Sequence, residues 1–295
     1  MVKHKFGGSW TDDKLERIRK YLAAYTTISH ANKRARYFRT TYLDAFAGTG
    51  TRTDSAQSDR SEGGSLFDLA ADSDAKSLKD GSARIALEVE PPFDHYLFVE
   101  QDADRAAELE SLRTMYSGRG IRVERAEANT FLCSWCSETN WRRNRAVVFL
   151  DPYGMQVDWT TVEAIASTKG IDLWWLFPLG VAVSRLLKKE ELPSERFAQA
   201  LTRIFGTDKW KSALYRSREE ATLFGPEMTI KKTADFEELG SFVVGRLRSL
   251  FAGVATNPLA LRNSKDVPIY LLCFAAGNKK GAPTAVDIAE HVLKA

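Results

Sequence analysis

The order of strand-like and helix-like segments constrains the fold of this chain more than any other feature. Runs rich in aromatic and β-branched residues alternate with segments that place apolar residues three or four positions apart. The expected strands are residues 37–46, 95–100, 121–128, 145–154, 171–180 and 268–277. Because helices between consecutive strands make those strands parallel, the pattern predicts an α/β fold with a Rossmann-like, doubly wound, mostly parallel sheet.

The alternation stops after Val183, and this break sets the expected domain organisation. Residues 184–256 contain helix-like patterns such as "SERFAQALTRIFG" and "DFEELGSFVVGRLRSLFAG", so we expect a helical insertion before the last strand. The α/β core then comprises residues 1–183 and 257–295, with an N-terminal helix over residues 11–29. The insertion is a candidate for substrate or partner recognition.

Cysteine content and hydropathy indicate the compartment. Cys133, Cys136 and Cys273 cannot form a disulfide framework, which favours a reducing environment. No apolar run reaches the ~18 residues that span a bilayer, and the first residues lack a signal-peptide core, so we expect a cytoplasmic protein. Cys133 and Cys136 form a lone C-x-x-C without a second pair or nearby histidines, so we expect no metal site.

Three of the expected strands end in a carboxylic acid, which is costly to bury unless a ligand or partner uses it. These acids are Asp44, Glu100 and Asp151. Ligands of open α/β sheets bind beyond the carboxyl ends of the strands, so all three are candidate site residues. The first acid is followed by "AFAGTG", in which Gly48 and Gly50 allow a ligand to approach the backbone closely.

The residues around Asp44 do not match the common phosphate-binding motifs. The chain has no G-x-x-x-x-G-K-[ST], which excludes a P-loop, and it has only G-x-G of the dinucleotide pattern G-x-G-x-x-G. A carboxylate beside a pyrophosphate would be repulsive, which argues against a nicotinamide dehydrogenase. A ligand with a positive centre and an amino group fits better, and S-adenosylmethionine has both. Glu100 could bind both ribose hydroxyls through its two oxygens.

The fourth strand ends in "FLDPYG", a sequence suited to holding a flat amine. Pro152 fixes the backbone after Asp151, and the carboxylate and carbonyl groups here can accept hydrogen bonds from the amine. Tyr153 offers an aromatic face for stacking. We therefore expect Asp151, Pro152 and Tyr153 to hold the acceptor for direct in-line methyl transfer, without a metal or a covalent intermediate.

Three short motifs, "DAFAGTG", "FVEQD" and "LDPYG", resemble the first, second and fourth motifs of class I S-adenosylmethionine-dependent methyltransferases. The fourth also resembles the D-P-P-Y and D-P-F-G motifs of enzymes that methylate amino groups of nucleic-acid bases. More narrowly, "LDPYGMQVDWTTVEAIASTKGIDLWWLFP", "IFGTDKW" and "PIYLLCFAAGNKKGAPTAVDIAEHVL" resemble the bacterial three-Cys-motif partner protein (TcmP) family. The resemblance implies a Rossmann-like methyltransferase fold, S-adenosyl-L-methionine as cofactor, and a cysteine-rich protein partner.

The resemblance also assigns cofactor-binding roles. The residues that it implies in the first two motifs are Asp44, Phe46, Gly48, Gly50 and Glu100. Of these, Asp44, Gly48 and Gly50 would hold the methionine end of the cofactor, and Glu100 would hold the ribose.

Two motifs depart from the family pattern. The third motif usually supplies an Asp that accepts a hydrogen bond from the adenine amine, but here it is "AEAN". Glu127 takes the place of that Asp, and Asn129 is a second candidate. The fourth motif lacks a second proline and has Gly154 after its aromatic residue, which weakens the inference to base-amine chemistry but not the inference to the cofactor.

Basic residues gather in the segments "HANKRARYFRT" and "WRRNR". The nucleic-acid-binding candidates are Lys33, Arg34, Arg36, Arg142 and Arg143. Such clusters suit phosphate backbones, although a solvated face explains each cluster alone equally well. Together with the motifs they favour a nucleic-acid substrate methylated at a base nitrogen. The alternatives are a protein or small-molecule substrate, and a non-catalytic protein that acts with a cysteine-rich partner.

Overall fold

The computed structural model describes residues 9–48, 81–222 and 225–294, so Gly50 lies outside the described residues. Eight strands in these ranges form one sheet. They are β1 (Arg39–Asp44), β2 (His95–Val99), β3 (Ile121–Glu124), β4 (Asn144–Leu150), β5 (Ile171–Phe177), β8 (Gly253–Val254), β9 (Leu259–Arg262) and β10 (Pro268–Ala276). The sheet order is β3-β2-β1-β4-β5-β10-β8, and β9 also pairs with β10.

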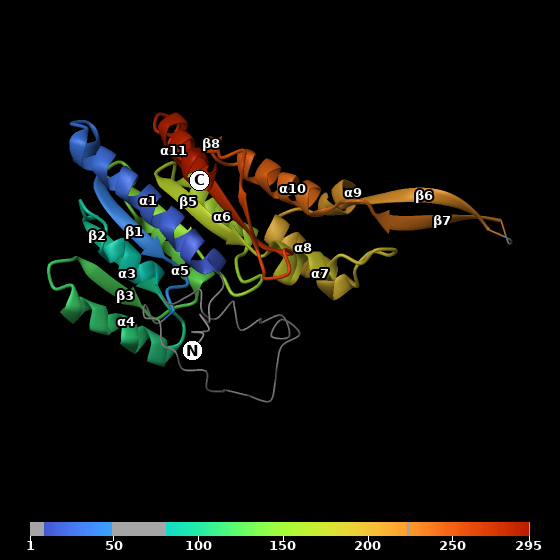
Figure 1. Ribbon diagram of the computed structural model, residues 1–295, viewed down its shortest axis with the longest axis horizontal. Helices are drawn as coiled ribbons and strands as arrows, with labels where there is room; N and C mark the ends of the chain where they lie inside the picture. Colours follow the sequence, from blue (N-terminus) through green and yellow to red (C-terminus); the bar gives the residue numbers. More distant parts are fainter. Residues whose placement is uncertain (1–8, 49–80, 223–224, 295) are drawn as a thin grey trace, which may run out of the picture.

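The first five strands run parallel, and β10 runs antiparallel to β5. Helices cover the sheet, and those between β1 and β5 in the sequence connect the parallel strands (Figure 1). They are α1 (Ser9–Ala31), α3 (Ser82–Leu87), α4 (Ala103–Met115), α5 (Ala128–Glu138), α6 (Trp159–Ser167) and α11 (Ala282–Lys294). The predicted fold class, a Rossmann-like, doubly wound and mostly parallel sheet, is therefore confirmed. Among the described helices, none has the length and apolar character that crossing a membrane requires.

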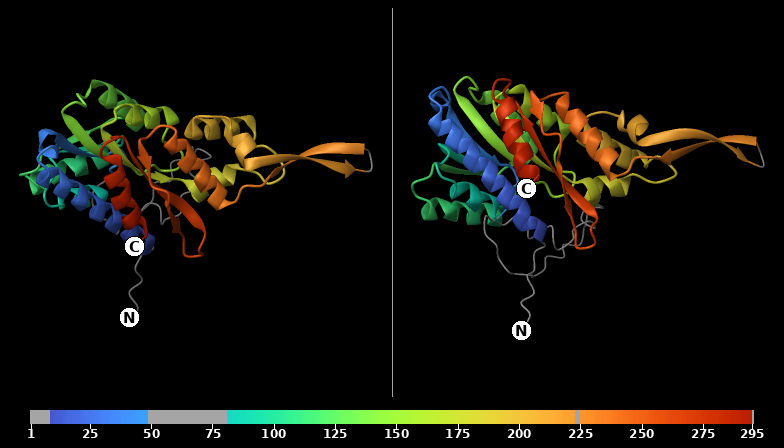
Figure 2. Two further views of the ribbon diagram at one scale, coloured as in Figure 1. Left: turned by 90° about the horizontal axis from the view of Figure 1, so that it is seen from above. Right: turned by 45° about the horizontal axis from the view of Figure 1, so that its top comes forward.

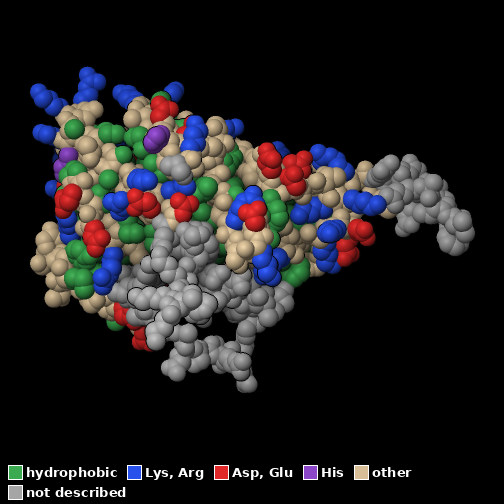
Figure 3. Space-filling model, in the orientation of Figure 1, with side chains coloured by type: hydrophobic (Ala, Val, Ile, Leu, Met, Phe, Trp, Pro, Cys, Tyr) green, Lys and Arg blue, Asp and Glu red, His purple; other side chains and the backbone are tan. Residues whose placement is uncertain are grey.

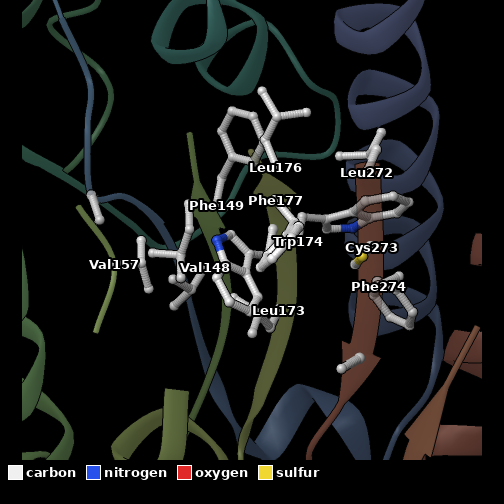
Figure 4. Close-up of a cluster of buried hydrophobic side chains, with 14 of the residues drawn as sticks. Val148, Phe149, Val157, Leu173, Trp174, Leu176, Phe177, Leu272, Cys273 and Phe274 are labelled. Atoms are coloured by element: carbon white, nitrogen blue, oxygen red, sulfur yellow. The ribbon is translucent and has the colours of Figure 1, made fainter. Parts of the chain in front are cut away.

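Side-chain alternation along β5 divides the core between the two faces of the sheet. Trp174 packs against Tyr21 of α1 with ring centroids 5.2 Å apart, while its neighbour Trp175 packs against Trp159 of α6 at 6.4 Å. Both β5 tryptophans are at most 1 % exposed. Trp174 and Phe274 belong to the buried cluster shown in Figure 4. The "WWLFP" segment is thus packed core.

Residues 184–256 contain a hairpin as well as helices. The helices are α7 (Ser184–Leu186), α8 (Glu195–Phe205), α9 (Trp210–Leu214) and α10 (Phe236–Arg248), and the hairpin consists of β6 (Tyr215–Thr222) and β7 (Gly225–Lys232). We expected a helical insertion here. The hairpin strands "YRSREEAT" and "GPEMTIKK" lack the apolar alternation that marks a strand packed on a core. The hairpin instead extends away from the body, so no core constrains its pattern (Figure 2).

A glycine fixes the end of α8 against α6. Gly206 caps α8 in the left-handed conformation, with φ of 65°. A Cβ at this position would lie 1.9 Å from the ring of Trp159, the first residue of α6. The close approach therefore requires glycine for both its backbone angle and its missing side chain.

We expect Gly206→Ala to lower the free energy of unfolding by roughly 1–3 kcal/mol, because the methyl group must displace the Trp159 ring and the residue must keep a positive φ. Urea denaturation followed by circular dichroism measures the change. Gly245→Ala is the matched control: Gly245 is exposed within α10, and a Cβ there would meet nothing within 4 Å. This control should be neutral or raise stability by about 0.5–1 kcal/mol. Equal losses in both variants would contradict the packing argument.

Candidate active site

The three acids predicted from the sequence lie at one edge of the sheet. β1 lies between β2 and β4, and Asp44 is in register with Phe98 and Phe149 on these neighbours. Glu100 and Asp151 each follow those partners by two residues. The exposed fractions of Asp44, Glu100 and Asp151 are 0 %, 8 % and 5 %. The sheet order reverses between β1 and β4, and this switch point is where open α/β sheets bind ligands.

Asp44 is held by two donors in a fully buried position. Its carboxylate accepts hydrogen bonds from the Ser82 hydroxyl at 2.6 Å and from the backbone N–H of Phe46 at 3.2 Å. Burial raises the pKa of Asp44 to about 6; the hydroxyl of Ser82 opposes the rise, and the charge of Asp151 adds to it. The nearby ammonium group of Lys14 also opposes the rise. A cation placed beside this group would favour its ionised form.

Glu100 links the turn after β1 to the start of α4. One carboxylate oxygen accepts from the backbone N–H of Gly48 and the other from that of Asp102, both at 3.0 Å. Gly48 has φ of 62°, so the glycine predicted at this turn meets a conformational requirement. Each carboxylate oxygen can accept more than one hydrogen bond, so Glu100 retains capacity for hydroxyl donors.

Asp151 forms a buried ion pair that sequence reasoning missed. The ammonium group of Lys14, on α1, donates to Asp151 Oδ2 at 2.7 Å and lies 5.3 Å from the centroid of the Phe149 ring. The Lys14 side chain is 0 % exposed. The signal was available, because Lys14 lies four residues before Ile18 on the apolar stripe of the N-terminal helix. A lysine on such a stripe needs a buried partner.

The residues after Asp151 form a tight turn. Pro152 is buried, and the backbone N–H of Tyr153 donates to Gln156 Oε1 at 2.8 Å. Gly154 has φ of 71°, so the glycine that departs from the family motif serves the backbone of this turn. The turn keeps Tyr153 partly exposed beside the candidate acceptor position.

The two residues of the third motif have structural roles. Glu127 caps α5 by accepting from the backbone N–H groups of Asn129 and Thr130 at 2.9 and 2.8 Å. Burial acts to raise the pKa of Glu127, but the bonds from Thr130 and Asn129 outweigh it and lower the pKa. Asn129 accepts from the backbone N–H of Asp158 and from the Thr161 hydroxyl, at 2.9 and 2.8 Å, which joins α5 to α6. A role for either residue in contacting adenine stays a prediction.

The predicted nucleic-acid-binding residues lie at the opposite edge of the sheet. Lys33, Arg34 and Arg36 precede β1, and Arg142 and Arg143 precede β4; all five are exposed. β1 has six residues, so its two ends are about 20 Å apart. The structure therefore brings the three acids together with Lys14 but does not bring these basic residues to them.

The C-x-x-C motif lies on α5 with both thiols free. Burial raises the pKa of Cys136 to about 12. No group of three His, Cys, Asp or Glu side chains within the described ranges is placed to hold a metal ion.

Comparison with known proteins yields no family. No family model matches the chain, and no curated protein matches it. Protein LPL1258 from Legionella pneumophila, described with the family model DUF519, is 15% identical, with 83% of this chain and 94% of that chain covered and a TM-score of 0.41. A conserved hypothetical protein from Streptococcus pyogenes is 15% identical, with coverage of 68% and 89% and a TM-score of 0.29.

An S-adenosylmethionine-dependent methyltransferase from Clostridium acetobutylicum is 10% identical, with 89% of this chain and 92% of that chain covered and a TM-score of 0.36. All three TM-scores are below 0.5, so we rest the fold on strand order and the function on the site. Membership of the three-Cys-motif partner protein family stays a prediction.

We expect Lys14→Met to lower the free energy of unfolding by about 3–5 kcal/mol, because Asp151 would remain as a buried charge without its partner. Adding Asp151→Asn removes that charge and should recover a large part of the loss. Urea denaturation of both single variants and the double variant gives the coupling energy. Strictly additive losses would contradict a direct interaction.

Asp44 should make stability depend on pH. Its folded-state pKa is raised from 3.8 to about 6, so its contribution is fully present below about pH 4 and is lost as pH rises through 6. Asp44→Asn serves as the reference, because Asn cannot titrate. The free energy of unfolding of wild type minus that of the variant should fall by up to about 3 kcal/mol between pH 4 and pH 7. Denaturant titrations at several pH values measure this difference, and a constant difference would refute the raised pKa.

Proposed function

We propose that this chain is an S-adenosylmethionine-dependent methyltransferase that modifies a nucleic acid, with a base nitrogen as the acceptor. The observation that carries the proposal is the cluster of Asp44, Glu100 and Asp151 at the switch point between β1 and β4. Three carboxylates with one paired lysine leave an excess of negative charge. This arrangement favours a cationic ligand and disfavours a pyrophosphate.

The residues at this edge fit the cofactor. When bound, S-adenosylmethionine supplies an electrophilic methyl group on a sulfonium centre. Asp44 would face the cationic methionine end, while Gly48 leaves room beside the backbone. Glu100 would accept from the ribose hydroxyls, because each of its oxygens accepts from one backbone N–H of the described residues and can accept a second donor. Glu127, on the next strand-to-helix turn, would accept from the adenine amine.

The turn that begins at Asp151 would position the acceptor. Asp151 Oδ1 and the carbonyl of Pro152 can accept the protons of an exocyclic amine, which aims the nitrogen lone pair at the methyl group. Lys14 holds the other oxygen of Asp151 and so fixes the carboxylate in one orientation. The ring of Tyr153 can stack on a flat base. These residues contribute positioning and charge stabilisation, and they need no nucleophile of their own.

The test is methyl transfer from labelled cofactor to separate pools of tRNA, rRNA, DNA and protein. We expect label in one nucleic-acid pool, and we expect Asp151→Asn to lower the transfer rate by roughly 10²–10³-fold through loss of amine positioning. Label that appears only in protein, or that persists in the nucleic acid with Asp151→Asn, would overturn the assignment.

Calorimetry separates the cofactor site from the acceptor site. Asp44→Asn should weaken binding of S-adenosylmethionine about 10-fold or more, because the sulfonium loses a buried counter-charge. Asp104→Asn, an exposed acid in the first turn of α4, is the matched control and should bind as wild type does. A folded wild-type protein that gives no heat with the cofactor would remove the catalytic proposal.

A further inference from the structure

Exposed charge on the face drawn in Figure 3 does not single out a surface for the acceptor, because basic and acidic side chains are interspersed over its described part. Buried polar groups beside Asp151 are the better guide to how an acceptor base would be held. The last long strand of the sheet, β10, supplies one such group.

β10 carries a tyrosine on the side of the sheet that faces α1. The ring of Phe274, on β10, packs against Tyr21 of α1 with centroids 4.9 Å apart. Because side chains alternate along a strand, Tyr270, four residues before Phe274, points to the same side. Asp151 lies on this side as well, since it accepts from Lys14 of α1.

Tyr270 also lies at the carboxyl edge of the sheet, because β10 runs antiparallel to β5. Leu271 pairs with Phe177, the last residue of β5, so Tyr270 extends past the end of that strand. The chain just before Tyr270 is closely packed: a Cβ at Gly180 would lie 2.0 Å from the carbonyl oxygen of Pro268. This close approach holds the start of β10 against the backbone that follows β5.

Tyr270 interacts electrostatically with the candidate acceptor turn. Burial raises the pKa of its hydroxyl, and the charge of Asp151 and the ionisable hydroxyl of Tyr153 raise it further. The interaction crosses β5, the one strand that separates β4 from β10. Tyr270 is 4 % exposed and Asp151 is 5 % exposed, so the two groups are withdrawn from solvent to the same extent.

The two groups offer complementary hydrogen-bonding roles. The raised pKa keeps the phenol of Tyr270 protonated at neutral pH, so its hydroxyl can donate, and the carboxylate of Asp151 can only accept while it is ionised. A donor and an acceptor side by side match a base edge on which an amine lies next to a ring nitrogen with a lone pair. Adenine and cytosine both present such an edge.

We propose that Tyr270 is a specificity-determining residue of the acceptor site, whose hydroxyl donates to the ring nitrogen beside the amine that Asp151 holds. This inference rests on the proposed function. Two hydrogen bonds fix the orientation of the base, so the amine stays aimed at the methyl carbon. In the transfer, the nitrogen lone pair forms the new N–C bond, the C–S electron pair stays on sulfur, and one amine proton passes to the carboxylate of Asp151.

The first test identifies the methylated atom. Wild type is incubated with labelled S-adenosylmethionine and separate tRNA, rRNA and DNA pools, and the labelled pool is digested to nucleosides for mass spectrometry. We expect the methyl group on the exocyclic amine of adenine or of cytosine, and the masses of the two nucleosides tell them apart. A methyl group on any other base nitrogen would overturn this inference while the proposed function stands.

The second test removes a single oxygen atom. We expect Tyr270→Phe to lower kcat on the labelled substrate about 10–100-fold, since the base loses one of its two hydrogen bonds. Its melting temperature and its calorimetric affinity for S-adenosylmethionine should stay close to those of wild type. Tyr96→Phe is the matched control, because Tyr96 is buried near the start of β2 and its hydroxyl accepts from the backbone N–H of Phe93 at 3.0 Å. The control should keep the kcat of wild type; an unchanged kcat in Tyr270→Phe would mean that the tyrosine only packs, and would overturn the inference.

A substrate analogue tests the same contact in the wild-type protein. An oligonucleotide of the labelled sequence carries 1-deazaadenine or 3-deazacytosine at the methylated position, so that CH replaces the ring nitrogen. Wild type should lose about 10–100-fold in kcat/KM on this analogue, and Tyr270→Phe should lose little more, because its contact is already absent. Equal losses in the two proteins would overturn the inference. If wild type labels no nucleic-acid pool at all, the proposed function fails and this inference fails with it.

Discussion

The ammonium group of Lys14 and the carboxylate of Asp151 share a buried position, and the candidate site depends on this pair. The two residues are 137 positions apart in the sequence and are in contact at 2.7 Å. Taking both charges out of water is costly, and their attraction offsets the cost only while both remain in place. The pair therefore ties the N-terminal helix to the turn after β4. It also holds one oxygen of Asp151 in a fixed position.

Charge is distributed unevenly between the two edges of the sheet. Asp44, Glu100 and Asp151 gather where β1, β2 and β4 end, and exposed basic residues gather where β1 and β4 begin. Parallel strands produce this separation, because all residues that follow such strands meet at one edge and all that precede them meet at the other. The basic residues before β1 and β4 therefore do not contact a substrate bound at the acidic edge. Residues from other parts of the chain would have to bind it there.

Much of the fold and part of the site could be predicted from the sequence. The alternation of strands and helices predicted the parallel strands, and the acids that end three of them are neighbours as expected. Arg142 and Arg143 lie at the opposite edge because they precede β4. Lys14 was missed because a charged residue on an apolar helical stripe is identified by its partner, and that partner lies on a distant strand. The β6–β7 hairpin was missed because its residues lack apolar alternation.

The sequence by itself determined the parallel strands and connecting helices of the α/β core and which strand ends carry acids, because those properties depend on neighbours two to four positions away. Only the tertiary structure decided that Lys14 neutralises Asp151 and that Asn129 joins α5 to α6. Such contacts join residues tens of positions apart. They depend on how helices pack on the sheet, and local patterns do not encode that packing.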